Sequence, residues 1–153
     1  MDVIQQELAA GFPNAEQLTR IAFRLLTTVL LAGVLGLQRE RTGKPAGLRT
    51  HMLVALSSTI FVLAPLEAGM EVADLSRVIQ GVATGIGFLG AGAILKLESR
   101  EQISGLTTAA GIWMTAALGV ASGMGRYGLA LITVALGWAI LQLLTRLEAH
   151  PGH

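Results

Sequence analysis

The chain has 153 residues, of which 52% are hydrophobic and only 14% are charged, and its formal net charge is +1. A soluble domain carries about 25% charged residues, so this composition indicates a membrane protein. The balanced charge gives no reason to expect nucleic acid as a partner, and the lack of cysteine excludes disulfides, thiolate metal sites and cysteine catalysis.

A polar segment, 1–18, precedes five apolar segments of about 20 residues each. The polar segment lacks the basic start of a signal peptide, and we expect a short surface helix or a loose tail. Each apolar segment approaches the length that crosses roughly 30 Å of hydrocarbon as a helix. The sequence therefore predicts an all-α integral membrane protein with a bundle of five transmembrane helices. The expected spans are 19–37, 48–66, 78–95, 106–124 and 127–145, within a domain of 19–147 that is followed by a tail, 148–153.

The third span is uncharged and rich in glycine. Its glycines are Gly81, Gly85, Gly87, Gly90 and Gly92. In water each would cost a helix about 1 kcal/mol against alanine, but in a bilayer the helix persists and glycine lets neighbouring helices approach. We expect the third span to be the central helix of the bundle. The fourth span, which has Gly119 and Gly123 at GxxxG spacing, is its expected packing partner.

Residues 85–90, GIGFLG, also match the G-x-G-x-x-G pattern of dinucleotide-binding folds. That pattern needs a preceding strand, a following helix and an acid about 20 residues on. After Glu101 the next acid is Glu148, and the surrounding chain is too apolar for a soluble sheet. We therefore reject a nucleotide site.

The basic residues predict an orientation in the membrane. If the N-terminus lies outside, seven basic residues fall on the cytoplasmic side and four on the outer side, so the positive-inside rule places the C-terminus in the cytoplasm. The seven are Arg39, Arg41, Lys44, Arg49, Lys96, Arg100 and Arg146, and the four are Arg20, Arg24, Arg77 and Arg126.

The densest polar cluster begins with QRER at 38–41. One interpretation is a positive-inside anchor whose arginines reach the lipid headgroups. The other is a folded cytoplasmic site, in which Glu40 satisfies Arg39, Arg41 or Arg49 and His51 lies within the second helix. One carboxylate and one histidine among the cations argue against a metal site, and the metal ligands stay unassigned. The candidate binding or regulatory surface comprises Arg39, Glu40, Arg41, Lys44, Arg49, His51, Thr107 and Thr108, the two threonines either capping the fourth helix or facing the basic loop.

The spans contain no acid at membrane depth, and this counts against a simple magnesium carrier. No pair of acids and no Ser/His/acid set is present to support catalysis, so we expect no enzyme. Trp113 and Trp138 lie in the middle of their spans, where we expect them to pack in the core.

Five motifs in order resemble the MgtC/SapB family of bacterial membrane proteins, over about 25–147. They are GLQRER at 36–41, KPAGLRTH at 44–51, GIGFLGAG at 85–92, GLTTAA at 105–110, and Trp113 followed by AALG at 116–119. The resemblance implies a multi-pass inner-membrane protein tied to survival at low magnesium and, in pathogens, to virulence. Family members are more often regarded as regulators than as transporters, and one is thought to restrain the F-type ATP synthase.

The chain departs from the family pattern at two positions. Gln38 stands where the family has an acid, and a glutamine usual at the position of Gly81 is replaced by a neighbouring one, Gln80. The leading hypothesis is a non-enzymatic protein of magnesium homeostasis that regulates another membrane complex, such as the F-type ATP synthase. The alternative is a transporter of magnesium or another small ion. We expect no cofactor, with magnesium left open, and as partners the bilayer, a second copy of the chain, an ATP synthase or a small membrane protein.

Overall fold

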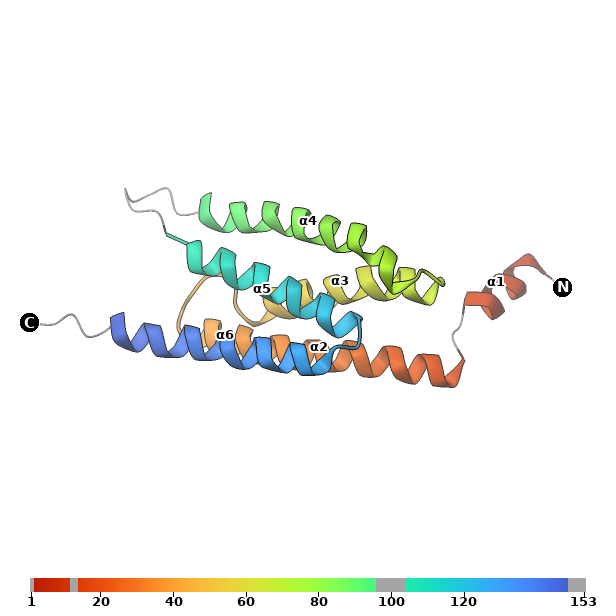
Figure 1. Cartoon of the computed structure of the whole chain (residues 1–153), viewed down its shortest axis with the longest axis horizontal. Helices are drawn as coiled ribbons and strands as arrows, with labels where there is room; N and C mark the ends of the chain where they lie inside the picture. The colour runs from red at the N-terminus through yellow and green to blue at the C-terminus, as the bar shows by residue number, and fades with distance from the viewer. Residues whose placement is uncertain (1, 12–13, 96–103, 149–153) are drawn as a thin grey trace, which may run out of the picture.

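The computed structural model describes residues 2–11, 14–95 and 104–148, and within these ranges every regular element is helical (Figure 1). The helices are α1 (Val3–Gly11), α2 (Ala15–Arg41), α3 (Leu48–Glu67), the short 3-10 helix η1 (Val72–Asp74), α4 (Leu75–Leu95), α5 (Leu106–Gly123) and α6 (Tyr127–Glu148). The all-helical prediction is confirmed. The connection expected between the third and fourth predicted spans, 96–105, and the predicted tail, 148–153, fall almost wholly outside the described residues.

Four helical segments in the described ranges are long and apolar enough to cross a membrane: α2, α3, the segment 72–94 that contains most of α4, and α5. In α6 the apolar helix found in the described residues is shorter, 127–143. The described residues therefore contain several helices of the predicted length and hydropathy, whereas the count of five is not established.

The first predicted span differs most from its helix, because α2 is longer at both ends. At its start the Asn14 side chain accepts from the Gln17 backbone N–H at 2.8 Å, and the Gln17 side chain accepts from the Asn14 N–H at 3.1 Å. This capping box satisfies two helix-end donors, so the helix begins before the apolar run does. At its other end the QRER segment, which we expected in a loop, forms the last turn of α2.

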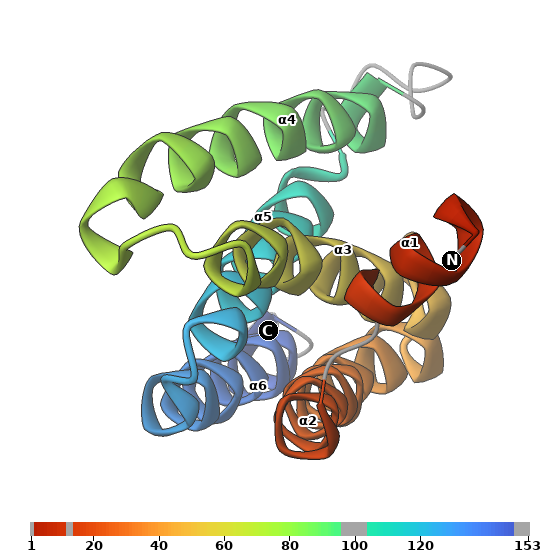
Figure 2. The same cartoon turned by 90° about the vertical axis from the view of Figure 1, so that its right-hand side faces the viewer.

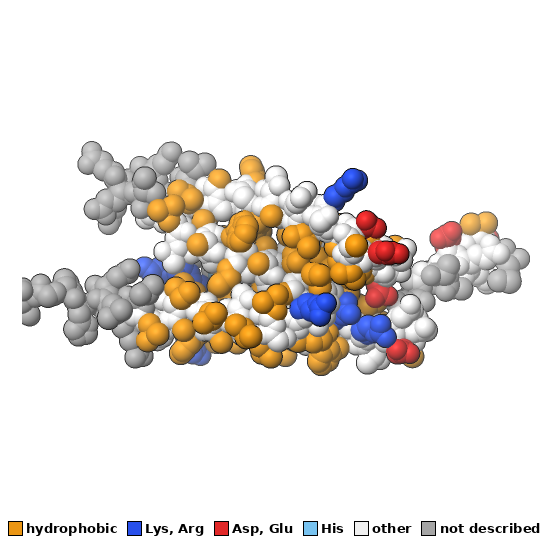
Figure 3. Space-filling view, viewed as in Figure 1, with side chains coloured by type: hydrophobic (Ala, Val, Ile, Leu, Met, Phe, Trp, Pro, Cys, Tyr) orange, Lys and Arg blue, Asp and Glu red, His pale blue; other side chains and the backbone are white. Residues whose placement is uncertain are grey.

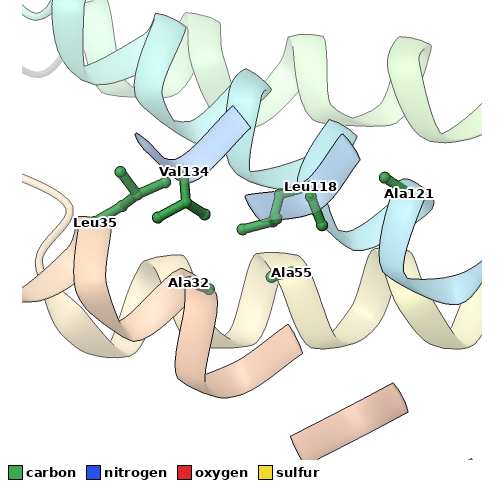
Figure 4. Packing of buried hydrophobic residues seen from close by; sticks show 7 residues of the cluster. Ala32, Leu35, Ala55, Leu118, Ala121 and Val134 are labelled. Carbon is green, nitrogen blue, oxygen red and sulfur yellow. The ribbon is translucent and has the colours of Figure 1, made fainter. Parts of the chain in front are cut away.

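The helices form three layers (Figures 1 and 2). The first layer contains α2 and α6, the middle layer α3 and α5, and the third only α4. From α2 to α6 successive helices run in alternating directions, so α2 begins and α6 ends at opposite ends of the bundle (Figure 1). A core of small and branched side chains joins the first two layers (Figure 4). Its buried members are Ala32, Leu35, Ala55, Leu118, Ala121, Ala130 and Val134.

The predicted central helix is wrong, because α5 and not α4 occupies the middle of the bundle. In the most apolar stretch of α5, 56% of the residues are buried inside the chain, against 6% for the segment that contains α4. A Cβ added at four of the α4 glycines would meet no atom within 4 Å, and at the fifth it would touch only Ala109, at 3.6 Å. The glycines of α4 therefore do not mediate close helix packing within this chain. The four without a neighbour are Gly81, Gly85, Gly87 and Gly92, and the fifth is Gly90.

The two glycines of α5 behave differently. A Cβ on Gly119 would collide with the carbonyl oxygen of Ala55, and one on Gly123 would lie 2.9 Å from the Cβ of Val62. Both glycines therefore allow α5 to approach the backbone of α3, as close packing of membrane helices requires. The prediction that the tryptophans pack in the core is wrong, since Trp113 is 54% exposed and Trp138 is 44% exposed.

Candidate functional site

The residues of the predicted surface gather at one end of the bundle, where α2 ends and where α3 and α5 begin (Figure 1). We call this end the basic end. Arg39, Glu40 and Arg41 lie in the last turn of α2, and Lys44 lies in the connection that follows. The other members occupy the first turn of a helix: Arg49 and His51 in α3, and Thr107 and Thr108 in α5.

Arg39 is a buried link between two helices. Only 4% of it is exposed, and its Nη2 donates a hydrogen bond to Thr108 Oγ1 at 2.6 Å. Among the described residues it forms no ion pair, and its buried Nε has no hydrogen-bond partner. Thr107, next along the chain, is exposed. Of the two threonines only Thr108 faces this cluster, where it joins the end of α2 to the beginning of α5.

Glu40 caps the following helix. Its Oε2 accepts the backbone N–H of Leu48, the first residue of α3, at 2.9 Å. The N-cap position is Gly47, which has no side chain to fill this role, and a Cβ there would lie 2.8 Å from Glu40 Oε2. The expected pairing of Glu40 with an arginine is wrong, because the free N–H groups and positive dipole of the α3 N-terminus attract the carboxylate instead.

His51 fills the junction of α2, α3 and α5. It is 1% exposed, and its Nδ1 donates to the carbonyl oxygen of Gly47 at 3.0 Å. Its Nε2 is buried without a hydrogen-bond partner and faces α5, where a Cβ on Gly111 would lie 3.6 Å away. On the α2 side Gly36 lets α2 approach the first turn of α3, since a Cβ there would lie 2.8 Å from Leu48 Cα and 3.0 Å from His51 Cβ. The histidine is thus a packed structural residue.

Three basic side chains of the basic end are exposed. Arg41, Lys44 and Arg49 are exposed, and none of them forms a side-chain hydrogen bond or an ion pair with any residue the structure describes. The connection that carries Lys44 is shaped by two left-handed residues, Gly43 at φ 65° and Ala46 at φ 58°. Lys96 and Arg100 lie outside the described residues, as does the side chain of Arg146. The arrangement presents fixed positive charge and suits an acidic partner.

Two further features bear on the chemistry of this end. Gln38, where the family pattern has an acid, is 8% exposed, and its Oε1 has no hydrogen-bond partner. It therefore lies inside the bundle and contributes nothing to the exposed surface. In the part of the chain that the structure describes, no group of three or more His, Cys, Asp or Glu residues is placed to hold a metal ion.

A second polar network lies nearer the opposite end, and the sequence analysis did not identify it. Arg24 Nη1 donates to the carbonyl oxygen of Gly123 at 2.6 Å, at the end of α5. One turn further along α2, Thr28 Oγ1 lies 3.1 Å from Thr59 Oγ1, and Thr59 donates to the Gly119 carbonyl oxygen at 2.9 Å. The spacing of Arg24 and Thr28, four residues apart on one helix face, was the available signal.

Comparison with known proteins finds one matching family model and several similar bacterial proteins. The MgtC family model matches residues 25–150. Protein SrpB of Synechococcus elongatus is 50% identical over 123 residues, which cover 73% of this chain and 68% of SrpB. An Escherichia coli protein named "Putative magnesium transporter YhiD" is 37% identical, over 81% of this chain and 60% of its own length. Protein MgtC of Salmonella typhimurium is 36% identical, over 67% of this chain and 43% of MgtC. No solved structure shows significant similarity to the chain.

Proposed function

This chain belongs to the MgtC family, and from that membership we propose that it is a non-enzymatic, multi-pass protein of the bacterial inner membrane that serves magnesium homeostasis and adaptation to low magnesium. It acts by contact with another membrane complex, such as the F-type ATP synthase. The chain spans 43% to 68% of the length of the three relatives described above.

This proposal rests on the difference between the buried and the exposed residues of the basic end. Arg39, Glu40 and His51 are used within the fold, as a helix link, a helix cap and a packed ring. Arg41, Lys44 and Arg49 are exposed and unpaired among the described residues. Exposed charges on a rigid frame speed the encounter with an oppositely charged partner and fix its orientation. A contact regulator needs such a surface, and it needs no path through the bundle.

In the proposed topology the basic end faces the cytoplasm. The apolar part of α6, 127–143, completes a fifth span with the rest of that helix, Tyr127–Glu148. The N-terminus then lies outside and the C-terminus inside, in agreement with the positive-inside rule. The acidic side chains visible on the face drawn in Figure 3 lie at the opposite, outer end.

A second candidate function is transport of magnesium or another small ion, and the name given to YhiD favours it. Two cavities of about 770 and 640 Å³ flank α4, but both are lined mainly by apolar side chains. An ion path needs polar ligands that replace the water lost by the ion. The apolar lining therefore supports the contact regulator over the transporter.

The proposal is tested by a matched pair of arginines. Arg49 and Arg77 are both exposed and lie in the first turn of α3 and of α4, at opposite ends of the bundle. We expect Arg49→Gln, alone or with Arg41→Gln and Lys44→Gln, to abolish support of growth at low magnesium, while Arg77→Gln keeps it. Immunoblots of membranes check that all variants accumulate equally. Equal growth of the triple variant and Arg77→Gln would overturn the proposed surface.

The transporter alternative is tested on the same protein in liposomes. A magnesium-sensitive dye inside the vesicles reports uptake along an imposed gradient. The regulator predicts a flat trace for folded protein, together with slower ATP hydrolysis by F-type ATP synthase in vesicles that contain both proteins. Saturable magnesium uptake without an effect on ATP hydrolysis would reverse the ranking of the two functions.

A further inference from the structure

A basic cavity lies at the outer end of the bundle, where α2 begins and where α3 and α5 end. Its volume is about 240 Å³, and it is lined by Arg20, Arg24 and Arg126 together with Glu67 and apolar neighbours. Three guanidinium groups and one carboxylate leave a surplus of positive charge. The cavity is smaller than the 300–1,000 Å³ typical of sites for drug-sized molecules, and it suits a small anionic group.

The guanidinium groups have hydrogen-bond donors to spare. Arg24 uses Nη1 for the Gly123 carbonyl oxygen, but its buried Nε has no partner. Arg20 pairs with Glu16 at 2.8 Å, and this pair is exposed, with 54% and 81% of the two side chains accessible, so it is weak. Among the described residues Arg126 has no side-chain hydrogen bond or ion pair. Planar guanidinium groups with free donors match the oxygen atoms of a phosphate.

An apolar groove adjoins the basic cavity. The groove is the space of about 770 Å³ between α4, α5 and the beginning of α6, and Met124 and Arg126 line both spaces. Away from this junction the groove follows the helices past Val82 and Trp113. Figure 3 shows hydrophobic side chains between α4 and α6, with basic side chains at the end where α6 begins. The site therefore has positive charge at the helix ends and apolar surface along the helices. A phospholipid has the matching order, a charged headgroup followed by apolar acyl chains.

We propose that an anionic phospholipid binds here, with its phosphate in the basic cavity and an acyl chain in the apolar groove. A free phosphate would use the arginines but leave the groove unoccupied. A helix of a second copy would fill the groove but leave Arg24 and Arg126, which form no ion pair among the described residues, without a counter-ion. Only the lipid accounts for both spaces and for the residues that they share. The site is separate from the basic end and does not depend on the function proposed above.

A tryptophan in the groove can report on lipid binding by its fluorescence. Trp113 lines it, whereas Trp138, the second tryptophan of the chain, does not. In a Trp138→Phe background the fluorescence of the full chain in vesicles therefore reports on the groove alone. Bromine atoms on an acyl chain quench tryptophan at short range. We expect brominated phosphatidylglycerol, present as a minority lipid in unbrominated phosphatidylcholine, to quench Trp113 more than brominated phosphatidylcholine at the same fraction.

Two substitutions and a control assign the headgroup site. Arg20→Gln and Arg126→Gln should each lower the preference for phosphatidylglycerol about fivefold, the change that corresponds to about 1 kcal/mol for one basic residue at a membrane surface. Arg77→Gln removes an exposed arginine at the same end that does not line the cavity, and it should leave the preference unchanged. Arg24 is kept, because it also caps α5. Equal elution volumes and Trp113 emission spectra without brominated lipid check that the variants are folded.

Four results would overturn the proposal. The first is equal quenching by the two brominated lipids, and the second is a preference that survives the double substitution of Arg20 and Arg126. The third is loss of the preference on adding inorganic phosphate, which would show that the cavity takes a free anion. The fourth is quenching by either lipid that rises as the protein is diluted in the membrane, which would place a second copy of the chain in the groove.

Discussion

Replacing Gly119 by alanine should destabilise the bundle more than any single alanine on α4. The added Cβ would collide with the carbonyl oxygen of Ala55 and would lie 2.8 Å from the Cβ of Ser58. Ordinary contact begins at 3.4 Å, so α3 and α5 must separate by about 0.6 Å at Ser58 alone. Such overpacking costs about 1–3 kcal/mol.

The same separation weakens a hydrogen bond between the two helices. Thr59 Oγ1 donates to the carbonyl oxygen of Gly119 at 2.9 Å, and a shift of about 0.6 Å takes this distance to the limit at which a hydrogen bond persists. Hydrogen bonds between membrane helices contribute about 0.6 kcal/mol on average. We therefore expect Gly119→Ala to lower the free energy of unfolding by about 2–3 kcal/mol.

The assay is unfolding of the purified protein in mixed micelles as the mole fraction of sodium dodecyl sulfate rises, followed by far-ultraviolet circular dichroism. Gly85→Ala is the matched control, since a Cβ at Gly85 of α4 meets no atom within 4 Å. Its effect should stay within about 0.5 kcal/mol. If Gly119→Ala and Gly85→Ala shift the unfolding curve equally, the close approach of α3 and α5 is not a determinant of stability.

Two other predictions concern the basic end. Thr108→Val removes the acceptor and Arg39→Met removes the donor of the buried hydrogen bond at 2.6 Å, so each should destabilise by about 1–3 kcal/mol. A double-mutant cycle should show a coupling of at least about 0.5 kcal/mol. Additive effects in the unfolding assay would mean that the bond contributes nothing. Glu40→Ala should lower the free energy of unfolding by about 1 kcal/mol through loss of the α3 cap, whereas Glu40→Gln, which keeps an acceptor oxygen, should lower it less than half as much. Hydrogen exchange at the Leu48 amide measures the difference. Equal exchange rates in the two variants would refute the cap.

Most helix boundaries were predictable because the chain breaks its helices with glycine. The predicted starts at 48, 106 and 127 coincide with the observed first residues of α3, α5 and α6. Gly105 and Gly125 precede two of these starts at φ 96° and 73°, values that a residue with a side chain rarely adopts. Hydropathy failed at the end of α2, because a helix needs hydrogen-bonded turns and not apolar side chains, and it therefore continues through Arg41.

The choice of central helix could not be made from glycine content, since α4 and α5 are both rich in small residues. What separates them is burial. In α4 large side chains such as Phe88, which is 82% exposed, remain on the surface of the bundle, whereas α5 buries polar residues such as Thr115 and Ser122. Hydroxyl side chains are more numerous in α5 than in α4. Because hydroxyls within an apolar helix favour contact with other helices, that signal was available in the sequence.

At the candidate site the sequence predicted which side chains lie near one another but not their contacts, and the role of these residues as a binding or regulatory surface stays a prediction. The eight surface residues do come to one end of the bundle, because alternating helices bring the last turn of α2 and the first turns of α3 and α5 together. The partner of Glu40 was missed, because the arginines lie close in sequence whereas the free N–H of Leu48 exists only once α3 has formed. Side chains near a helix end satisfy its backbone first.

The edge position of α4 has a consequence for biosynthesis. Chains enter the membrane from the N-terminus, so α2 and α3, which pack closely on each other, can form their hairpin before the rest is made. The main neighbour of α4 is α5, which is translated after it, and α3 touches it far less. During this interval α4 must persist in lipid as a solitary helix. Its exposed large side chains, Phe88 and Leu89, then face lipid in the nascent chain as well as in the finished bundle.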